Sequence, residues 1–289
     1  YELTEGLRLN FTAANNNIVR NYFIDDNLDG DQDPSLGVWD RFFDFGDPNR
    51  HTQQLGINYE LPLNKFPALS FVTSNYSYTG DFQWNKGSDL LVGDADTTLG
   101  NSISNASQHN LNTSFDMRKL YRYLGIKKSS KRNRASRSKD KTPNPRASSK
   151  SKKFNLKDFG IGLITSVNRM QINYSEGNSS FLPGYLPTPG FLGTLRPTAG
   201  YTFGSQRDIR RISAENGWLT TYDQFNQQYT ETHTQNIDFS INMEPISDLK
   251  IDLTGGKTYA TNFTESFNAV GNTFNSLLIK SEARKVSVK

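Results

Sequence analysis

The sequence has no cysteine, only three methionines and three histidines, and no apolar run long enough for a membrane-crossing helix. Without cysteine there are no disulfides, thiolate metal sites or cysteine nucleophiles. His51, His109 and His233 lie far apart and lack the spacing of a metal motif. No P-loop, dinucleotide-binding glycine pattern or nucleophile elbow is present. We therefore expect no enzymatic activity, no bound metal and no cofactor.

Apolar residues are also scarce, at 34 % of the 289 residues, whereas aromatic residues reach 12 %. A soluble globular domain has about 45–50 % apolar residues, and a disordered chain lacks aromatics. Strands with one aromatic-rich face and one polar face exposed to water would combine a low apolar fraction with a high aromatic fraction, as in transmembrane barrels. The composition therefore favours an outer-membrane barrel.

Apolar and polar residues alternate with a period of two along much of the chain, which predicts β-strands. In each predicted strand the second face consists of Asn, Ser, Thr and Gln, which is typical of antiparallel sheets. We expect about eight strands, which include residues 7–13, 55–61, 76–84, 111–117, 170–174, 201–203, 237–243 and 249–267. The predicted fold is an all-β, antiparallel transmembrane β-barrel segment. Residues 1–126 and 154–289 belong to the same barrel.

The predicted strands are joined by connections of two kinds. Residues 62–67 and 244–248 form short turns that contain proline, whereas residues 21–50, 87–98 and 177–197 form long loops. Strict up-and-down alternation of the eight strands puts the two short turns on opposite rims. This conflicts with the usual arrangement in barrels and predicts an unrecognised strand between residues 158 and 244. Residues 207–219 predict one short helix that ends near Gly217.

Two sets of apolar residues are candidates for contacts outside the chain. Ile237, Phe239 and Ile241 alternate with polar residues and are predicted to face lipid, whereas Asp238 and Asn242 face the other way. In the loop 179–194, four of the apolar or aromatic residues are candidate anchors, and they lie among three prolines and three glycines. These four residues either fold over the barrel's own rim or contact a partner. They are Phe181, Tyr185, Phe191 and Leu192.

One acidic segment has the spacing of a calcium-binding loop. Asp25, Asn27, Asp29, Asp31 and Asp33 match the first nine positions of an EF-hand loop. The twelfth position, a bidentate glutamate in EF-hands, is Leu36 here, and no helices are predicted to flank it. A solvated acidic loop is the favoured interpretation.

Residues 127–153 form a basic tract with twelve lysines and arginines and one aspartate. The tract contributes +11 to a net charge of +4, so the rest of the chain carries about −7 (4 − 11). It has no aromatic residues, so it lacks the stacking platform of single-strand nucleic-acid binders. We expect a solvated, disordered loop on the rim of the 62–67 turn. Contact with anionic lipid, peptidoglycan or an acidic partner is the alternative, and nucleic acid is disfavoured.

Several phrases, in order from residue 3 to about 253, resemble the SprA (Sov) family, the outer-membrane translocon of the type IX secretion system in gliding Bacteroidetes. The most specific are "PLNKFP", "LPGYLPTPGFLG" and "GSQRDIRRISAENGWLT". Longer ones are "TQQLGINYELPLNKFPALSFVTSNYSYTGDFQW" and "LGNSISNASQHNLNTSFDM". The basic tract and the acidic loop lie outside these phrases.

The resemblance implies a late fragment of a giant protein-conducting barrel in the outer membrane. The implied partners are the rest of that barrel, a porin-like cap of the PorV type, a periplasmic plug, secreted proteins and outer-membrane lipid. The ending "IKSEARKVSVK" lacks the aromatic terminal strand of a complete barrel, which also favours a fragment. The residues leave two alternatives, namely a small self-contained outer-membrane barrel and a surface β-sandwich that binds a ligand.

Overall fold

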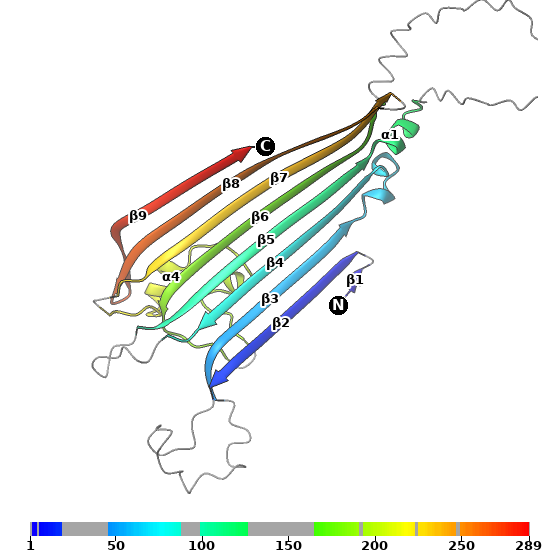
Figure 1. The fold of residues 1–289 in the computed structure, drawn as a ribbon. Coiled ribbons are helices and arrows are strands. Elements are labelled where there is room, and N and C mark those ends of the chain that lie inside the picture. Colours follow the sequence, from blue (N-terminus) through cyan, green and yellow to red (C-terminus); the bar gives the residue numbers. More distant parts are fainter. Residues whose placement is uncertain are drawn as a thin grey trace, which may run out of the picture.

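The computed structural model describes residues 2–4, 6–18, 46–87, 99–126, 165–190, 193–222, 225–246 and 249–288. These residues form one nine-stranded antiparallel sheet in which each strand pairs with the next along the chain (Figure 1). The strands are β1 (Glu2–Thr4), β2 (Leu7–Ile18), β3 (Asp47–Leu61), β4 (Val72–Asn85), β5 (Asn101–Asp116), β6 (Val167–Tyr185), β7 (Gln228–Ile246), β8 (Leu249–Val270) and β9 (Thr273–Val288). The sheet is continuous across the basic tract, because β5 pairs with β6.

The two ends of the sheet carry different connections. We call one end the turn rim. It holds the short β3–β4 and β7–β8 connections, the 3₁₀ turns η1 (Leu63–Lys65) and η2 (Pro67–Leu69), and the helix α1 (Met117–Tyr123). β5 ends and β6 begins at the same rim, so the basic tract connects there although it lies outside the described residues. The opposite end, the loop rim, holds the β2–β3, β4–β5 and β6–β7 connections and the tight β8–β9 turn (Figure 1).

The predicted strand at residues 201–203 is wrong. This error explains why the two short turns were predicted to lie on opposite rims. Tyr201 belongs to helix α3 (Ala199–Thr202), which begins after Thr198, whose hydroxyl accepts a hydrogen bond from the Tyr201 amide at 3.1 Å. Among the described residues between 165 and 246, only β6 and β7 are strands. The predicted extra strand is therefore also wrong, and both short turns lie on the same rim.

Several strands differ from the predictions. Met117 begins helix α1 rather than ending a strand, because the Asp116 side chain accepts from the Lys119 amide and caps the helix. β6 continues to Tyr185, where residues 177–197 were predicted to be a loop, since β5 pairs with it up to that residue. β9 was not predicted. Its sequence alternates poorly, and it forms by pairing with β8.

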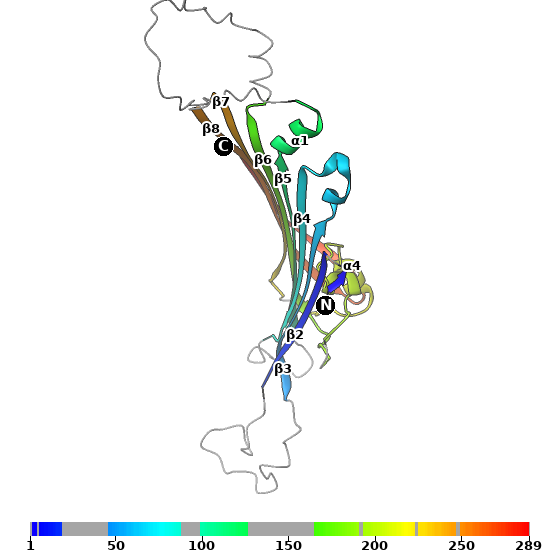
Figure 2. The ribbon, with the colours of Figure 1, turned by 90° about the vertical axis from the view of Figure 1, so that its right-hand side faces the viewer.

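The β6–β7 connection packs against one face of the sheet. We call residues 186–227 the covering segment, of which 186–190, 193–222 and 225–227 are described. It includes α3 and α4 (Arg210–Glu215), the latter inside the predicted helix 207–219 and followed by Gly217 at φ 66°. Figure 2 shows the strands edge-on as a single curved layer, with α4 on one side of it. Among the described residues, no helix combines the length and the apolar character needed to cross a membrane.

Candidate functional surfaces

The pairing register separates the side chains into two faces of opposite chemistry. One, the polar face, carries amides and hydroxyls over most of its area, with charged groups mainly toward the margins. It is hollowed, with a cavity of about 540 Å³ lined in part by Thr12, Gln54, Gln83 and Ser104. Representative residues from successive strands of this face are Asn10, Thr12, Gln54, Ser77, Thr79, Gln108, Asn110, Ser175, Thr234, Asn236 and Thr258.

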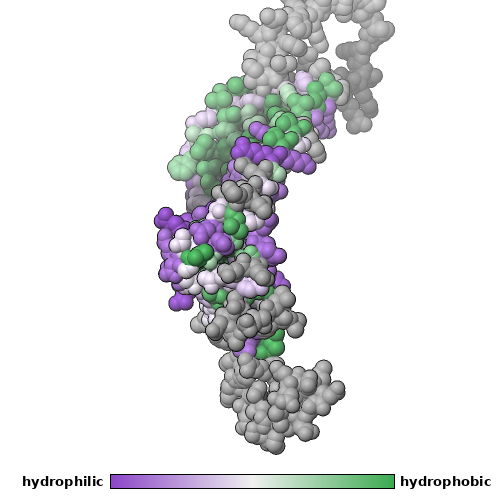
Figure 3. All heavy atoms as spheres, turned by 90° about the vertical axis from the view of Figure 1, so that its left-hand side faces the viewer, coloured by the Kyte–Doolittle hydropathy of each residue, from purple (hydrophilic) through white to green (hydrophobic). Residues whose placement is uncertain are grey.

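The opposite face carries an exposed apolar surface near the turn rim, which we call the apolar band. Ile237, Phe239 and Leu253 are 44 %, 43 % and 47 % exposed, although all three are large hydrophobic residues. Figure 3 views the molecule from the β9 side and shows hydrophobic atoms gathered toward the turn rim. The band comprises Leu7, Leu9, Phe11, Leu55, Ile57, Tyr59, Leu61, Val72, Tyr76, Tyr78, Leu111, Phe115, Met170, Ile172, Tyr174, Ile237, Phe239, Ile241, Met243, Ile251 and Leu253.

The apolar band crosses the strands obliquely. On β3 the band runs from Leu55 to Leu61. Followed from strand to strand through the paired residues, these two positions lead to His233 and Phe239 on β7. On β7, however, the band runs from Ile237 to Met243, so both borders have moved four residues toward the turn rim. At about 3.3 Å per residue and 4.8 Å per strand, the shift is about 13 Å along the strands for 19 Å across them. The strands are therefore inclined by about 35° to the perpendicular of the band.

Tyrosines mark the border of the apolar band on the side of the loop rim. The Tyr174 hydroxyl donates to Glu176 Oε2 at 2.5 Å, and the Tyr76 hydroxyl lies 2.8 Å from His109 Nδ1. The two polar partners, His109 and Glu176, are paired with each other across β5 and β6. They lie two residues closer to the loop rim than the paired Leu111 and Tyr174. The rings thus lie on the apolar side while the hydroxyls point to polar groups, which is how tyrosine lies at an interface between apolar and aqueous surroundings.

The covering segment buries the other half of this face. Trp84, Ile103 and Leu182 on the sheet pack with Tyr201 and Ile209 of the segment, and none of these five side chains is more than 1 % exposed. Sheet side chains also bind the segment's backbone. Tyr78 donates to the Phe203 carbonyl at 2.5 Å, Gln53 to Thr202 at 3.1 Å, and Trp84 to Pro187 at 3.0 Å. The segment is thus attached through both apolar and polar contacts.

The four apolar residues predicted in the 179–194 loop do not form one cluster in the described structure. Phe181 lies in β6 on the polar face and lines its hollow. Tyr185 ends β6 and is only 2 % exposed, with its ring 6.4 Å from that of Trp218. Phe191 and Leu192 lie outside the described residues. Tyr185 therefore packs within the chain.

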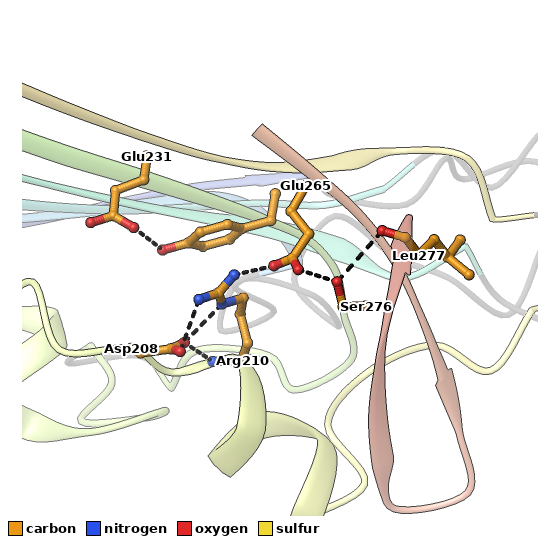
Figure 4. Close-up of polar contacts among 7 residues, drawn as sticks. Asp208, Arg210, Glu231, Glu265, Ser276 and Leu277 are labelled. Carbon is orange, nitrogen blue, oxygen red and sulfur yellow. Dashed lines mark hydrogen bonds and ion pairs between the residues drawn. The ribbon is translucent and has the colours of Figure 1, made fainter. Parts of the chain in front are cut away.

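Arg210 is the main polar link between the covering segment and the sheet (Figure 4). Its guanidinium contacts Asp208 at 2.9 Å and pairs with Glu265 of β8, a carboxylate only 2 % exposed. The guanidinium also lies 4.5 Å from the centre of the Tyr229 ring. Ser276 of β9 donates to the other oxygen of Glu265, so one cluster joins α4, β7, β8 and β9. Sequence reasoning missed this cluster, although a glutamate between Phe263 and Phe267 in an apolar alternation was a signal of a buried ion pair.

Charge pairing controls the protonation of this cluster. Burial opposes ionisation of Asp208, but hydrogen bonds from the Arg210 side chain and amide outweigh it and lower the pKa of that carboxyl. Burial likewise opposes the charge on Arg210, and the contact with Asp208 still raises the pKa of the guanidinium. Both groups are therefore ionised near neutral pH.

Within the described residues, the structure does not bring the three histidines together as a metal site. Within these residues, no group of three His, Asp or Glu side chains lies close enough to hold a metal ion. His51 is fully buried, with Nε2 3.0 Å from Gln53 Oε1, and His109 and His233 lie on the same face farther from the loop rim. The acidic segment with calcium-loop spacing lies outside the described residues.

A scan against protein-family models gives no match for this chain. A search of curated proteins also finds no relative.

Proposed function

We propose that the chain forms part of the wall of a protein-conducting pore in the outer membrane of a Gram-negative bacterium. The oblique apolar band is the observation that carries this proposal. Strands of outer-membrane barrels are tilted by about 35–45° and carry an outward apolar band bordered by aromatic residues. An inclination of about 35°, tyrosines at one border and an opposite face of amides and hydroxyls agree with lipid outside and water inside.

The position of the band along the strands also indicates which rim faces the cell surface. On β3 and β7 the band covers seven residues, about 20 Å along the strand. Exposed apolar residues of the turn rim lengthen it, among them Phe66 and Tyr123, each 59 % exposed. The strands continue well beyond the band toward the loop rim, so the covering segment stands outside the membrane. We place the loop rim at the cell surface and the turn rim, with the basic tract, in the periplasm.

The polar face then lines the pore, and the sheet is one part of a larger barrel. β1 and β9 are the outer strands of the described sheet, and unpaired strand edges are costly in lipid, so further strands must pair with them. The resemblance to the SprA family supplies the specific role, namely type IX protein secretion and gliding motility. Its implied partners are a PorV-type cap, a periplasmic plug and the secreted proteins. This role needs no catalytic residue, cofactor or nucleic acid.

Adjacent positions on β7 provide the test. In Ile241→Lys and Phe239→Lys, a charge enters the band and should reduce assembly into the outer membrane, since lysine near the middle of the bilayer costs about 2–4 kcal/mol. Asn242→Lys, on the polar face, is the matched control and should assemble normally. Assembly is measured as the fraction of chain that resists sarkosyl extraction. Equal assembly of all three variants would refute the proposal.

A further inference from the structure

A groove lies where the covering segment meets the tyrosine border of the apolar band. Its volume is about 480 Å³. Tyr76, Tyr78 and His109 form its floor on β4 and β5, and Gly204–Gln206 of the covering segment form one side. Ile57, a residue of the band, also lines it. The groove is therefore continuous with the surface that we assign to lipid chains.

The lining of the groove is polar but contains no Lys, Arg, Asp or Glu. The His109 imidazole and the Ser205 hydroxyl can each donate or accept, whereas the Asn178 and Gln206 amides are hydrogen-bonded within the chain. The Tyr78 and His109 ring centroids lie 4.8 Å apart, which gives a broad aromatic surface. Phosphate binding favours arginine or lysine, so this lining suits a neutral group with many hydroxyls better than an anionic one.

We propose that the groove binds the neutral sugar headgroup of a glycolipid whose acyl chains lie on the apolar band. The inference rests on the proposed function, because only a membrane at the level of the band brings headgroups to the groove. The groove also lies at the depth of the headgroups, because it starts at the tyrosine border, where the acyl chains end. The Tyr76 and Tyr78 rings pack against the sugar, and His109 and Ser205 hydrogen-bond its hydroxyls.

Lipid retention tests this proposal. The full chain is reconstituted with equal amounts of a monoglucosyl diacylglycerol and a phosphatidylcholine of the same acyl chains. Lipids that stay bound are then identified by native mass spectrometry. We expect the wild-type chain to retain the glucosyl lipid preferentially. His109→Phe keeps the aromatic surface but loses the imidazole, so the preference should fall about threefold or more, as for one lost hydrogen bond.

Two further variants make the result specific. Ser205 is exposed, so Ser205→Leu should fill the groove without disturbing the core and should also lower the preference. Thr79→Val changes a residue on the opposite face of β4 that does not line the groove, and it should retain the wild-type preference.

Three outcomes would overturn the assignment. They are equal retention of both lipids by the wild-type chain, an unchanged preference in His109→Phe and Ser205→Leu, and stronger retention of phosphatidylcholine than of the glucosyl lipid. A chain that inserts into the bilayer but shows any of these refutes the groove alone. If Phe239→Lys and Ile241→Lys assemble as well as Asn242→Lys, the proposed function fails, and the groove assignment falls with it.

Discussion

At the scale of single residues, Arg210 determines whether the covering segment stays on the sheet. Arg210→Met leaves Glu265 buried without its cation, and removing one member of a buried ion pair costs about 3–5 kcal/mol. We expect the amides of residues 199–222 to exchange hydrogen much faster than in the wild-type chain, whereas the band strands stay protected. Hydrogen–deuterium exchange with mass spectrometry measures both regions in one experiment.

Two control variants show whether this effect is specific to the buried pair. Arg211→Met removes a pair with Glu215 in which the side chains are 84 % and 56 % exposed, and such surface pairs contribute little. The double variant Arg210→Met with Glu265→Gln should recover part of the protection, because no buried charge is left unpaired. If Arg210→Met exchanged like Arg211→Met, the ion pair would not be what holds the segment.

At the scale of elements, the covering segment depends on a close approach of two backbones. A Cβ added at Gly80 of β4 would lie 2.2 Å from the Phe203 carbonyl oxygen, whereas a Cβ at Gly56 of β3 meets nothing closer than 3.7 Å. Gly80→Ala should therefore shift residues 203–204 and weaken the Tyr78–Phe203 hydrogen bond, at about 1–3 kcal/mol for overpacking. Limited proteolysis of the covering segment should be faster in Gly80→Ala and unchanged in Gly56→Ala. Equal cleavage rates in the two variants would mean that this contact does not position the segment.

The strands that could be predicted from the sequence are those in which apolar and polar residues alternate over several positions. Residues 55–61 and 237–243 lie in β3 and β7 as expected, and α4 lies within the predicted helix. Pro183 and Gly184 were interpreted as loop residues, yet β6 continues through them, and Tyr185 forms a bridge to Leu219 of the covering segment. Contacts with a distant segment fix that boundary, and one sequence does not reveal them.

At the scale of the whole molecule, the inclination of the band follows from the register between strands. Alternation along a strand assigns residues to a face, and it assigned Ile237 and Asp238 to opposite faces. It does not show how far β7 is displaced from β3, because the displacement accumulates through the pairings of β4, β5 and β6. The inclination of the band is therefore visible only in the structure, although the sequence already predicted that Ile237, Phe239 and Ile241 share one face.

The basic tract offers the last test at this scale. β5 and β6 are paired up to the turn rim, where Asp116 lies opposite Arg169, so the two strands do not need the tract to meet. Deleting residues 127–153 leaves eleven residues, 154–164, between Ile126 and Thr165. Loop-closure entropy depends on length, so shortening the connection from 38 to 11 residues lowers its cost by about 1 kcal/mol. We therefore expect the deleted chain to keep its strand content and to unfold at an equal or higher temperature.

The same deletion separates the possible roles of the tract. Strand content and thermal unfolding are measured by circular dichroism, and assembly by the fraction that resists sarkosyl extraction. A control chain keeps the length but replaces the twelve basic residues of the tract with serine. If both variants fold but assemble poorly, the positive charge contacts anionic lipid or an acidic partner. If both assemble normally, the tract is a solvated connector, whereas loss of strand content in the deleted chain would show that it is required for the fold.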